Sequence, residues 1–263
     1  MSIPNYIKEG EKPEYNDVFI SLNNGTQIPV LSTDNDIILQ LPIIIQAPKF
    51  KTWVTNLDVN LLDIESIKIN NVKWFCRTQD ISPSKLGFLY LELIAKDKRT
   101  NTPIPGIVFL RGNSVAVLIL VKIDNIDYVI TTKQMRVPIG KLMEEIPAGM
   151  MDADSNFSGV AMKEISEETG LKPPSENDLH FLGEISPSPG GCDEKISLYF
   201  WKTTISEEKK VELISKIHGE ADENESILLQ FILLDEFQKY IFEKGDVKGI
   251  CAFSMAKSKE YIR

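Results

Sequence analysis

The sequence predicts an α/β protein that is built around a mixed β-sheet and preceded by a mostly β region. Residues 114–123, SVAVLILVKI, form a nearly continuous apolar run that is typical of a central strand covered on both faces. Strand-like and helix-like segments are intermixed through residues 110–263, which favours a sheet sandwiched between helices. Residues 64–109 instead alternate apolar and polar positions, as half-buried strands do.

On this pattern the chain divides into an N-terminal region, residues 1–109, and a second domain, residues 110–263. The first part of the N-terminal region is weakly periodic, and we expect one short helix there, within residues 50–62. From about residue 64 we expect strands, with a turn at residues 100–105.

In the second domain, the apolar run at 114–123 is followed by Asp124 and Asn125, which suit a tight turn. We therefore expect the next residues to form the hairpin partner of the central strand. Further elements are expected as a strand at 195–205, a strand at 227–234 and an amphipathic helix at 235–244.

Charge and composition exclude some classes of partner. With 29 basic and 38 acidic residues the net charge is −9, which argues against nucleic-acid binding but not against a small anionic substrate. The three cysteines, Cys76, Cys192 and Cys251, are widely spaced, as expected of reduced thiols in a cytoplasmic protein. The longest apolar run, residues 37–48, is short and contains Pro42, so we expect no membrane partner and find no signal-peptide pattern.

An acidic helix is predicted over residues 158–169. Ser158 is a suitable N-cap, and Gly170 suits the left-handed position that follows a helix. Pro173, just beyond, does not continue a helix. We therefore expect the helix to end at Thr169.

Three glutamates, Glu164, Glu167 and Glu168, fall on one face of this helix, with only Lys163 close enough to balance them. A solvated acidic face is one interpretation. The other is a divalent metal site, because the Pro147-Ala148-Gly149 turn ahead of the helix supplies carbonyl oxygens, and Mg²⁺ and Mn²⁺ prefer several oxygen ligands.

Residues 149–171 resemble the signature of the Nudix hydrolases, which reads Gly, five residues, Glu, seven residues, Arg-Glu-apolar-x-Glu-Glu-x-Gly-apolar. Here the spacing is intact from Gly149 to KEISEETGL at 163–171. Two positions depart: Ser155 stands where Glu is usual, and Lys163 where Arg is usual. The match favours the metal-site interpretation over the solvated face.

Other segments resemble the ADP-ribose and ADP-sugar pyrophosphatase branch of this family, most of all the plant-type ADP-sugar diphosphatases. They are FLRG at 109–112, EIPAG at 145–149, SPGGCDE at 188–194 and EADENESI at 220–227. The resemblance implies a Nudix α/β/α sandwich around a mixed β-sheet, and a homodimer formed through the N-terminal regions.

The resemblance also implies hydrolysis of the pyrophosphate bond of a nucleoside diphosphate sugar with Mg²⁺ or Mn²⁺ as cofactor. The implied metal ligands are Ala148 (through its carbonyl), Glu164, Glu168 and Glu225. The implied catalytic residues are Glu223, as the general base, and Glu167, as a ligand or orienting residue. The implied substrate-binding residues are Arg136, Glu145 and Gly190. A carboxylate base is expected because His180 and His218 both lie outside the motifs.

Two alternatives stay open. One is a pyrophosphatase for UDP-sugars or other nucleoside diphosphates, since the sequence does not choose among ADP-ribose, ADP-glucose and UDP-glucose. The other is a catalytically weak Nudix-fold binding module, because Ser155 and Lys163 are departures from the signature. Lys163 keeps the positive charge of Arg but lacks the planar guanidinium that orients a neighbouring carboxylate at two points.

Overall fold

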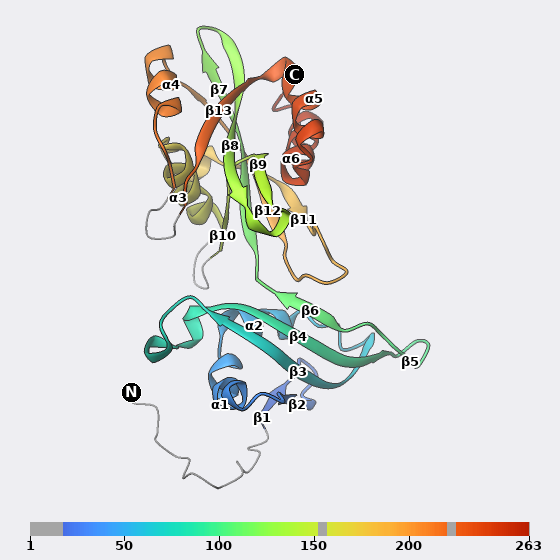
Figure 1. Cartoon of the computed structure of the whole chain (residues 1–263). Coiled ribbons are helices and arrows are strands. Elements are labelled where there is room, and N and C mark those ends of the chain that lie inside the picture. The colour runs from blue at the N-terminus through green and yellow to red at the C-terminus, as the bar shows by residue number, and fades with distance from the viewer. Residues whose placement is uncertain (1–17, 152–156, 220–224, 263) are drawn as a thin grey trace. The chain divides into compact units, whose positions relative to one another are not determined.

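The computed structural model describes residues 18–151, 157–219 and 225–262. The chain forms two compact units, Met1–Arg111 and Gly112–Arg263, and each is described by itself (Figure 1). Within the described ranges, we find no helix of the length and apolar character that crossing a membrane requires.

The first unit is built on a six-stranded sheet in the order β1-β2-β3-β4-β5, with β6 paired to β4. The strands are β1 (Val18–Ser21), β2 (Gln27–Leu31), β3 (Leu62–Trp74), β4 (Leu86–Asp97), β5 (Thr102–Pro103) and β6 (Ile107–Leu110). Two helices pack on one face of this sheet, α1 (Asn35–Ile44) and α2 (Pro48–Thr55). Alternation in β4 explains the packing, because Leu89, Leu91 and Leu93 are buried while Tyr90 and Ile94 are exposed.

For this unit one expectation needs correction, and one helix was missed. The helix expected within 50–62 ends at Thr55, and β3 already begins at Leu62. Helix α1 was not predicted, because it contains Pro42 and is too uniformly apolar to show a helical periodicity. Its start is nevertheless well defined, since the Asp34 side chain accepts hydrogen bonds from the N–H groups of Asp36 and Ile37.

The second unit contains a seven-stranded mixed sheet in the order β11-β12-β7-β8-β13, with β10 paired to β7 and β9 to β8. The strands are β7 (Ser114–Ile123), β8 (Ile126–Arg136), β9 (Lys141–Glu145), β10 (Ala148–Met150), β11 (His180–Ile185), β12 (Ile196–Thr204) and β13 (Leu228–Leu233). Strands β12 and β7 run parallel, and the other described pairs are antiparallel. The predicted mixed sheet is confirmed.

Helices cover both faces of this sheet (Figure 1). They are α3 (Phe157–Thr169) and α4 (Glu207–Ile214) on one face, and α5 (Leu234–Lys244) and α6 (Val247–Ser258) on the other. Central strand β7 is buried on both sides: Val117 packs in the cluster that includes Ile165 of α3, whereas Leu118 packs in the cluster that includes Phe237 and Phe253. The run at 114–123 is thus the central strand of an α/β/α sandwich, as its composition predicted.

Strands β7 and β8 separate after a short paired stretch. They are joined at Asp124 and Asn125, which have φ angles of 46° and 66°, as a two-residue hairpin turn requires. They pair only from Leu120 to Ile123 on the β7 side. Beyond that point β9 pairs with β8, and β10 pairs with β7, so both short strands fill the gap between the long ones.

The turn expected at Pro147-Ala148-Gly149 is therefore not a turn, since Ala148–Met150 forms strand β10. Pro147 has no N–H and falls where the chain leaves the edge of β8 and joins that of β7. Its carbonyl still accepts a hydrogen bond from the N–H of Val117. The break between β9 and β10 therefore places Ala148 and Gly149 in the gap between β7 and β8.

Candidate active site

Helix α3 carries the acidic cluster and packs against β10 and β7. It begins at Phe157, so Ser158 lies in its first turn and is not the N-cap that we expected. Its end agrees with the prediction: Gly170 has a φ of 68°, and its N–H donates to the carbonyl of Ser166. Burial of Ile165 sets the rotation of the helix and places Glu164 and Glu168 toward β10.

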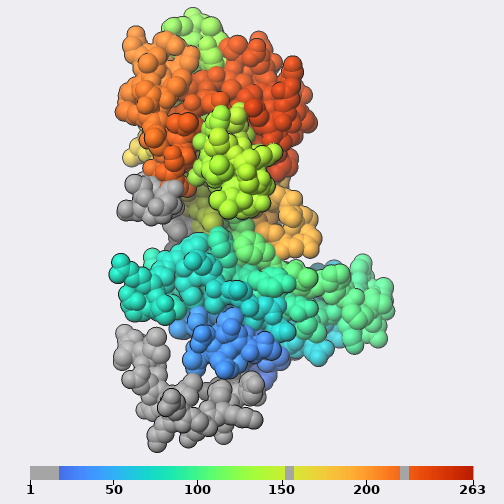
Figure 2. Space-filling model, viewed as in Figure 1, coloured from blue at the N-terminus to red at the C-terminus, as the bar shows by residue number. Residues whose placement is uncertain are grey.

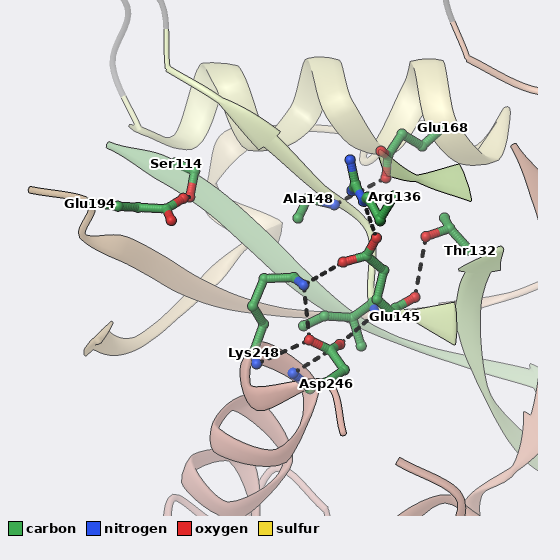
Figure 3. Close-up of polar contacts among 11 residues, drawn as sticks. Ser114, Thr132, Arg136, Glu145, Ala148, Glu168, Glu194, Asp246 and Lys248 are labelled. Atoms are coloured by element: carbon green, nitrogen blue, oxygen red, sulfur yellow. Dashed lines mark hydrogen bonds and ion pairs between the residues drawn. The ribbon is translucent and has the colours of Figure 1, made fainter. Parts of the chain in front are cut away.

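Glu168 is the most deeply placed of these glutamates, with 3% of its surface exposed. Its Oε2 accepts a hydrogen bond of 3.0 Å from the N–H of Ala148 (Figure 3). Burial and the nearby Glu164 raise the pKa of Glu168 well above its usual range. Glu225 acts in the same direction, whereas Arg136 opposes it. A buried carboxylate surrounded by like charges is a position that a cation would stabilise.

Glu164 lies one turn before Glu168 and rests on the backbone of β10. Gly149 has no room for a side chain, because an added Cβ would overlap the carboxylate of Glu164. The glycine that opens the signature and the first glutamate of its acidic part are therefore in direct contact. A side chain at position 149 would therefore displace the carboxylate of Glu164, even though the φ angle of Gly149 is not positive.

The backbone of Ala148 also faces this cluster. Its N–H donates to Glu168 and not to β7, and in an extended strand the N–H and C=O of one residue point to the same side. The carbonyl of Ala148 is thus directed away from β7, where a cation held by Glu164 and Glu168 would meet it. Within residues 18–151, 157–219 and 225–262, three or more acidic, His or Cys side chains do not converge as a complete metal site.

Arg136 and Glu145 meet beside the acidic cluster. Arg136, the last residue of β8, places Nε 2.6 Å from Oε1 of Glu145, and Figure 3 shows its guanidinium between Glu145 and Glu168. The side chain of Arg136 is 38% exposed. Val137, which follows it in the β8–β9 connection, is 81% exposed, and this hairpin forms part of the visible surface in Figure 2. A ligand arriving from solvent can therefore reach the guanidinium.

Glu145 is 4% exposed and is held by two cations. Its second oxygen, Oε2, lies 2.6 Å from Nζ of Lys248, in the first turn of α6. Burial alone would raise the pKa of Glu145, but the charges of Lys248 and Arg136 outweigh it and keep this pKa below its ordinary value. Glu145 is consequently a carboxylate anion at neutral pH.

Asp246, the N-cap of α6, completes this network (Figure 3). Its Oδ1 lies 2.8 Å from Nζ of Lys248, and its Oδ2 accepts a 2.9 Å hydrogen bond from the N–H of Ile146. Oδ2 also accepts from the N–H of Gly249. Neither Asp246 nor Lys248 was predicted from the sequence, where the available signal was Gly245-Asp246, a helix end followed directly by an N-cap.

The remaining predicted residues either have fewer contacts with the acidic cluster or lie outside the described residues. Glu225 is described and contributes to the charge around Glu168, but Glu223 lies outside the described residues, as does Ser155. Glu167 accepts a hydrogen bond at its carbonyl from the N–H of Gly219, so α3 contacts the chain that leads into residues 220–224. At Gly190 an added Cβ would meet nothing within 4 Å, so no steric contact requires glycine there.

Lys163, the second departure from the signature, pairs with Glu167 one turn later, at 3.5 Å. We expect Lys163→Arg to leave kcat unchanged or to raise it a few-fold, because a guanidinium orients a carboxylate at two points. Steady-state kinetics of the variant beside the wild type measures this. A tenfold or larger loss of kcat would show that the site has adapted to lysine.

Comparison with known proteins identifies the family of this chain. The family model of the NUDIX domain matches residues 111–253. Nudix hydrolase 14, chloroplastic, of Arabidopsis thaliana is 33% identical over 229 residues, which cover 83% of this chain and 74% of that protein. The methanol dehydrogenase activator of Bacillus methanolicus is 30% identical over 146 residues, 55% of this chain and 73% of its own. The ADP-ribose pyrophosphatase of Bacillus subtilis is 26% identical over 138 residues, which cover 51% of this chain and 68% of that protein.

The α/β/α sandwich and its acidic helix define a Nudix-type hydrolase fold. The chain belongs to the Nudix family. The prediction of a Nudix pyrophosphohydrolase is confirmed. Nudix hydrolases in general act on nucleotide derivatives with the help of divalent metal ions.

Proposed function

We propose that the protein hydrolyses the pyrophosphate bond of a nucleoside diphosphate sugar of the ADP-ribose or ADP-glucose type. The products are a nucleoside monophosphate and a sugar phosphate. The observation that carries this proposal is the placement of Glu168, a buried carboxylate among like charges, beside the guanidinium of Arg136. A divalent cation offsets such a concentration of negative charge, and a guanidinium binds phosphate oxygens. The ADP-ribose pyrophosphatase among the relatives supports the same class of substrate.

The residues fit a divalent ion such as Mg²⁺ or Mn²⁺, which would be held by Glu164, Glu168 and the carbonyl of Ala148, with Glu225 close by. When bound, such an ion neutralises negative charge on the phosphate oxygens. Arg136 orients the pyrophosphate, and Glu145 holds Arg136 in place. One water is consumed: its oxygen bonds to phosphorus, the bridging P–O bond breaks, and a carboxylate accepts the proton.

The general base in this proposal is Glu223, on the strength of the sequence resemblance. We expect Glu223→Gln to lower kcat by about 10²-fold, the usual scale for a lost base. Affinity for a non-hydrolysable ADP-sugar should stay within about threefold, because the base acts on water. Kinetics together with calorimetric binding test this. Unimpaired turnover in the variant would place the base elsewhere, with Glu167 the first to examine.

A substrate panel tests the proposed function itself. Purified protein is incubated with ADP-ribose, ADP-glucose or UDP-glucose, with Mg²⁺ or with Mn²⁺, and release of nucleoside monophosphate is measured. We expect the two ADP compounds to be hydrolysed faster than UDP-glucose, and no release once the metal is chelated. Faster UDP-glucose hydrolysis would favour the alternative pyrophosphatase. Binding without release, with either ion, would favour a binding module. The homodimer and the cytoplasmic location stay predictions, and sedimentation of the purified protein measures the first.

A further inference from the structure

Helix α6 is linked to Glu145 and Arg136, beside the acidic cluster, through Lys248, a residue that lies outside the signature. Two oxygens of Glu145 are each taken by a different cation: Oε1 by Nε of Arg136 and Oε2 by Nζ of Lys248, both at 2.6 Å. Arginine and glutamate tend to pair at two points, through two nitrogens and both oxygens. In this structure Lys248 occupies the second oxygen and leaves Arg136 a single contact with Glu145.

Lys248 is not needed merely to attach α6 to the sheet. That attachment is made by Asp246, whose side chain is 1% exposed and binds the N–H groups of Ile146 and Gly249. The amine of Lys248 instead lies between two carboxylates, with Nζ 2.8 Å from Oδ1 of Asp246 and 2.6 Å from Oε2 of Glu145. Its side chain is 14% exposed and is enclosed by these two carboxylates, which argues against a role in contacting substrate directly.

We propose that Lys248 is a positioning residue for substrate binding: by occupying Oε2 of Glu145, it keeps the terminal nitrogens of Arg136 turned toward the phosphate groups. The inference rests on the proposed function in that Arg136 is taken to bind the pyrophosphate. Without Lys248, Glu145 would pair with Arg136 through both oxygens. The guanidinium would then be both rotated away from the substrate and more completely neutralised.

The test is Lys248→Met, which removes the amine and retains most of the side-chain length. We expect KM for the hydrolysed nucleotide sugar to rise about tenfold, and kcat to stay within about threefold, because Arg136 binds phosphate in both the ground state and the transition state. Lys244→Met is the matched control. Lys244 pairs at 2.8 Å with Glu144, the residue before Glu145, and is not connected to Arg136 by any contact of the described residues. The control should leave KM within about twofold.

A double variant separates positioning from other effects. If Lys248 acts through Arg136, then Lys248→Met should change KM by less than about twofold in an Arg136→Met background, because the group it positions is gone. The same tenfold rise in both backgrounds would overturn the proposal. If Lys248→Met does not fold, Lys248→Gln keeps a hydrogen-bond donor without the charge, and the same comparison is made with it.

A measurement without turnover keeps this proposal distinct from the proposed function. The Nε–H signal of Arg136 in the NMR spectrum of ligand-free protein can be assigned by its loss in Arg136→Met. We expect this signal to shift in Lys248→Met and to stay unchanged in Lys244→Met. If no nucleotide sugar is hydrolysed but the signal shifts, the proposed function fails and the positioning stands. If the signal does not move, the positioning is wrong whatever the activity.

Discussion

Replacing Glu168 by glutamine is expected to lower kcat by about 10³-fold, while the metal-free protein becomes no less stable. The loss follows because a metal ligand contributes several kcal/mol of charge stabilisation in the transition state, and each 1.4 kcal/mol is about tenfold in rate. Stability should be kept or increased because burial, together with the nearby charge of Glu164, raises the pKa of Glu168 well above its usual range. The glutamine oxygen can still accept the N–H of Ala148.

The measurement is thermal unfolding with and without Mg²⁺, beside steady-state kinetics. The wild type should gain stability from the ion, since a ligand that binds the folded state stabilises it, and Glu168→Gln should gain little. Glu243→Gln, on the exposed side of α5, is the control and should behave as the wild type. A variant that keeps both its turnover and its stabilisation by Mg²⁺ would show that Glu168 is not a ligand.

Gly149→Ala is expected to lower kcat by between about 10²- and 10³-fold without altering a charged group. The new methyl group would overlap the carboxylate of Glu164, so that carboxylate must leave its place on β10. A displacement of about 1 Å at a catalytic group can cost about 10²-fold, and loss of a ligand adds to this. Kinetics over a range of Mg²⁺ concentrations should show a raised metal requirement.

Combination with Glu164→Gln shows whether the alanine acts through this contact. If the methyl group only displaces Glu164, the double variant should be no more than about threefold slower than Glu164→Gln alone, since effects on one contact do not add. Full additivity of the two losses would show that Gly149→Ala disturbs β10 itself. Wild-type turnover in Gly149→Ala would mean that the carboxylate moves aside without consequence.

The parts of the site that could be predicted are those that lie close together in the sequence. The spacing of Glu164 and Glu168 on one helix turn is local, and so is the glycine that ends α3. The continuous apolar run of β7 likewise predicts that this strand is buried on both faces. In each case the structural consequence depends on residues within a few positions, which periodicity and capping rules describe well.

The parts that could not be predicted depend on where the chain folds back. Lys248 is 103 residues from Glu145, and in the sequence it is an unremarked lysine at the start of a helix. Pro147 predicts a turn from the local sequence. In the structure it instead joins β9, which pairs with β8, to β10, which pairs with β7, because β7 and β8 separate there. Helix α1 was hidden by an internal proline that tertiary packing tolerates.

The hydrogen bond from Ile146 to Asp246 also has a consequence for the order in which the protein is made. The two residues are 100 positions apart, and at 5–20 residues per second the ribosome needs roughly 5–20 s to travel between them. For most of that interval, once residue 171 has been added, the nascent chain contains the whole signature, but Glu145 lacks Lys248 and the N–H of Ile146 lacks Asp246. These contacts at the end of the sheet therefore cannot form before the start of α6 has been synthesised.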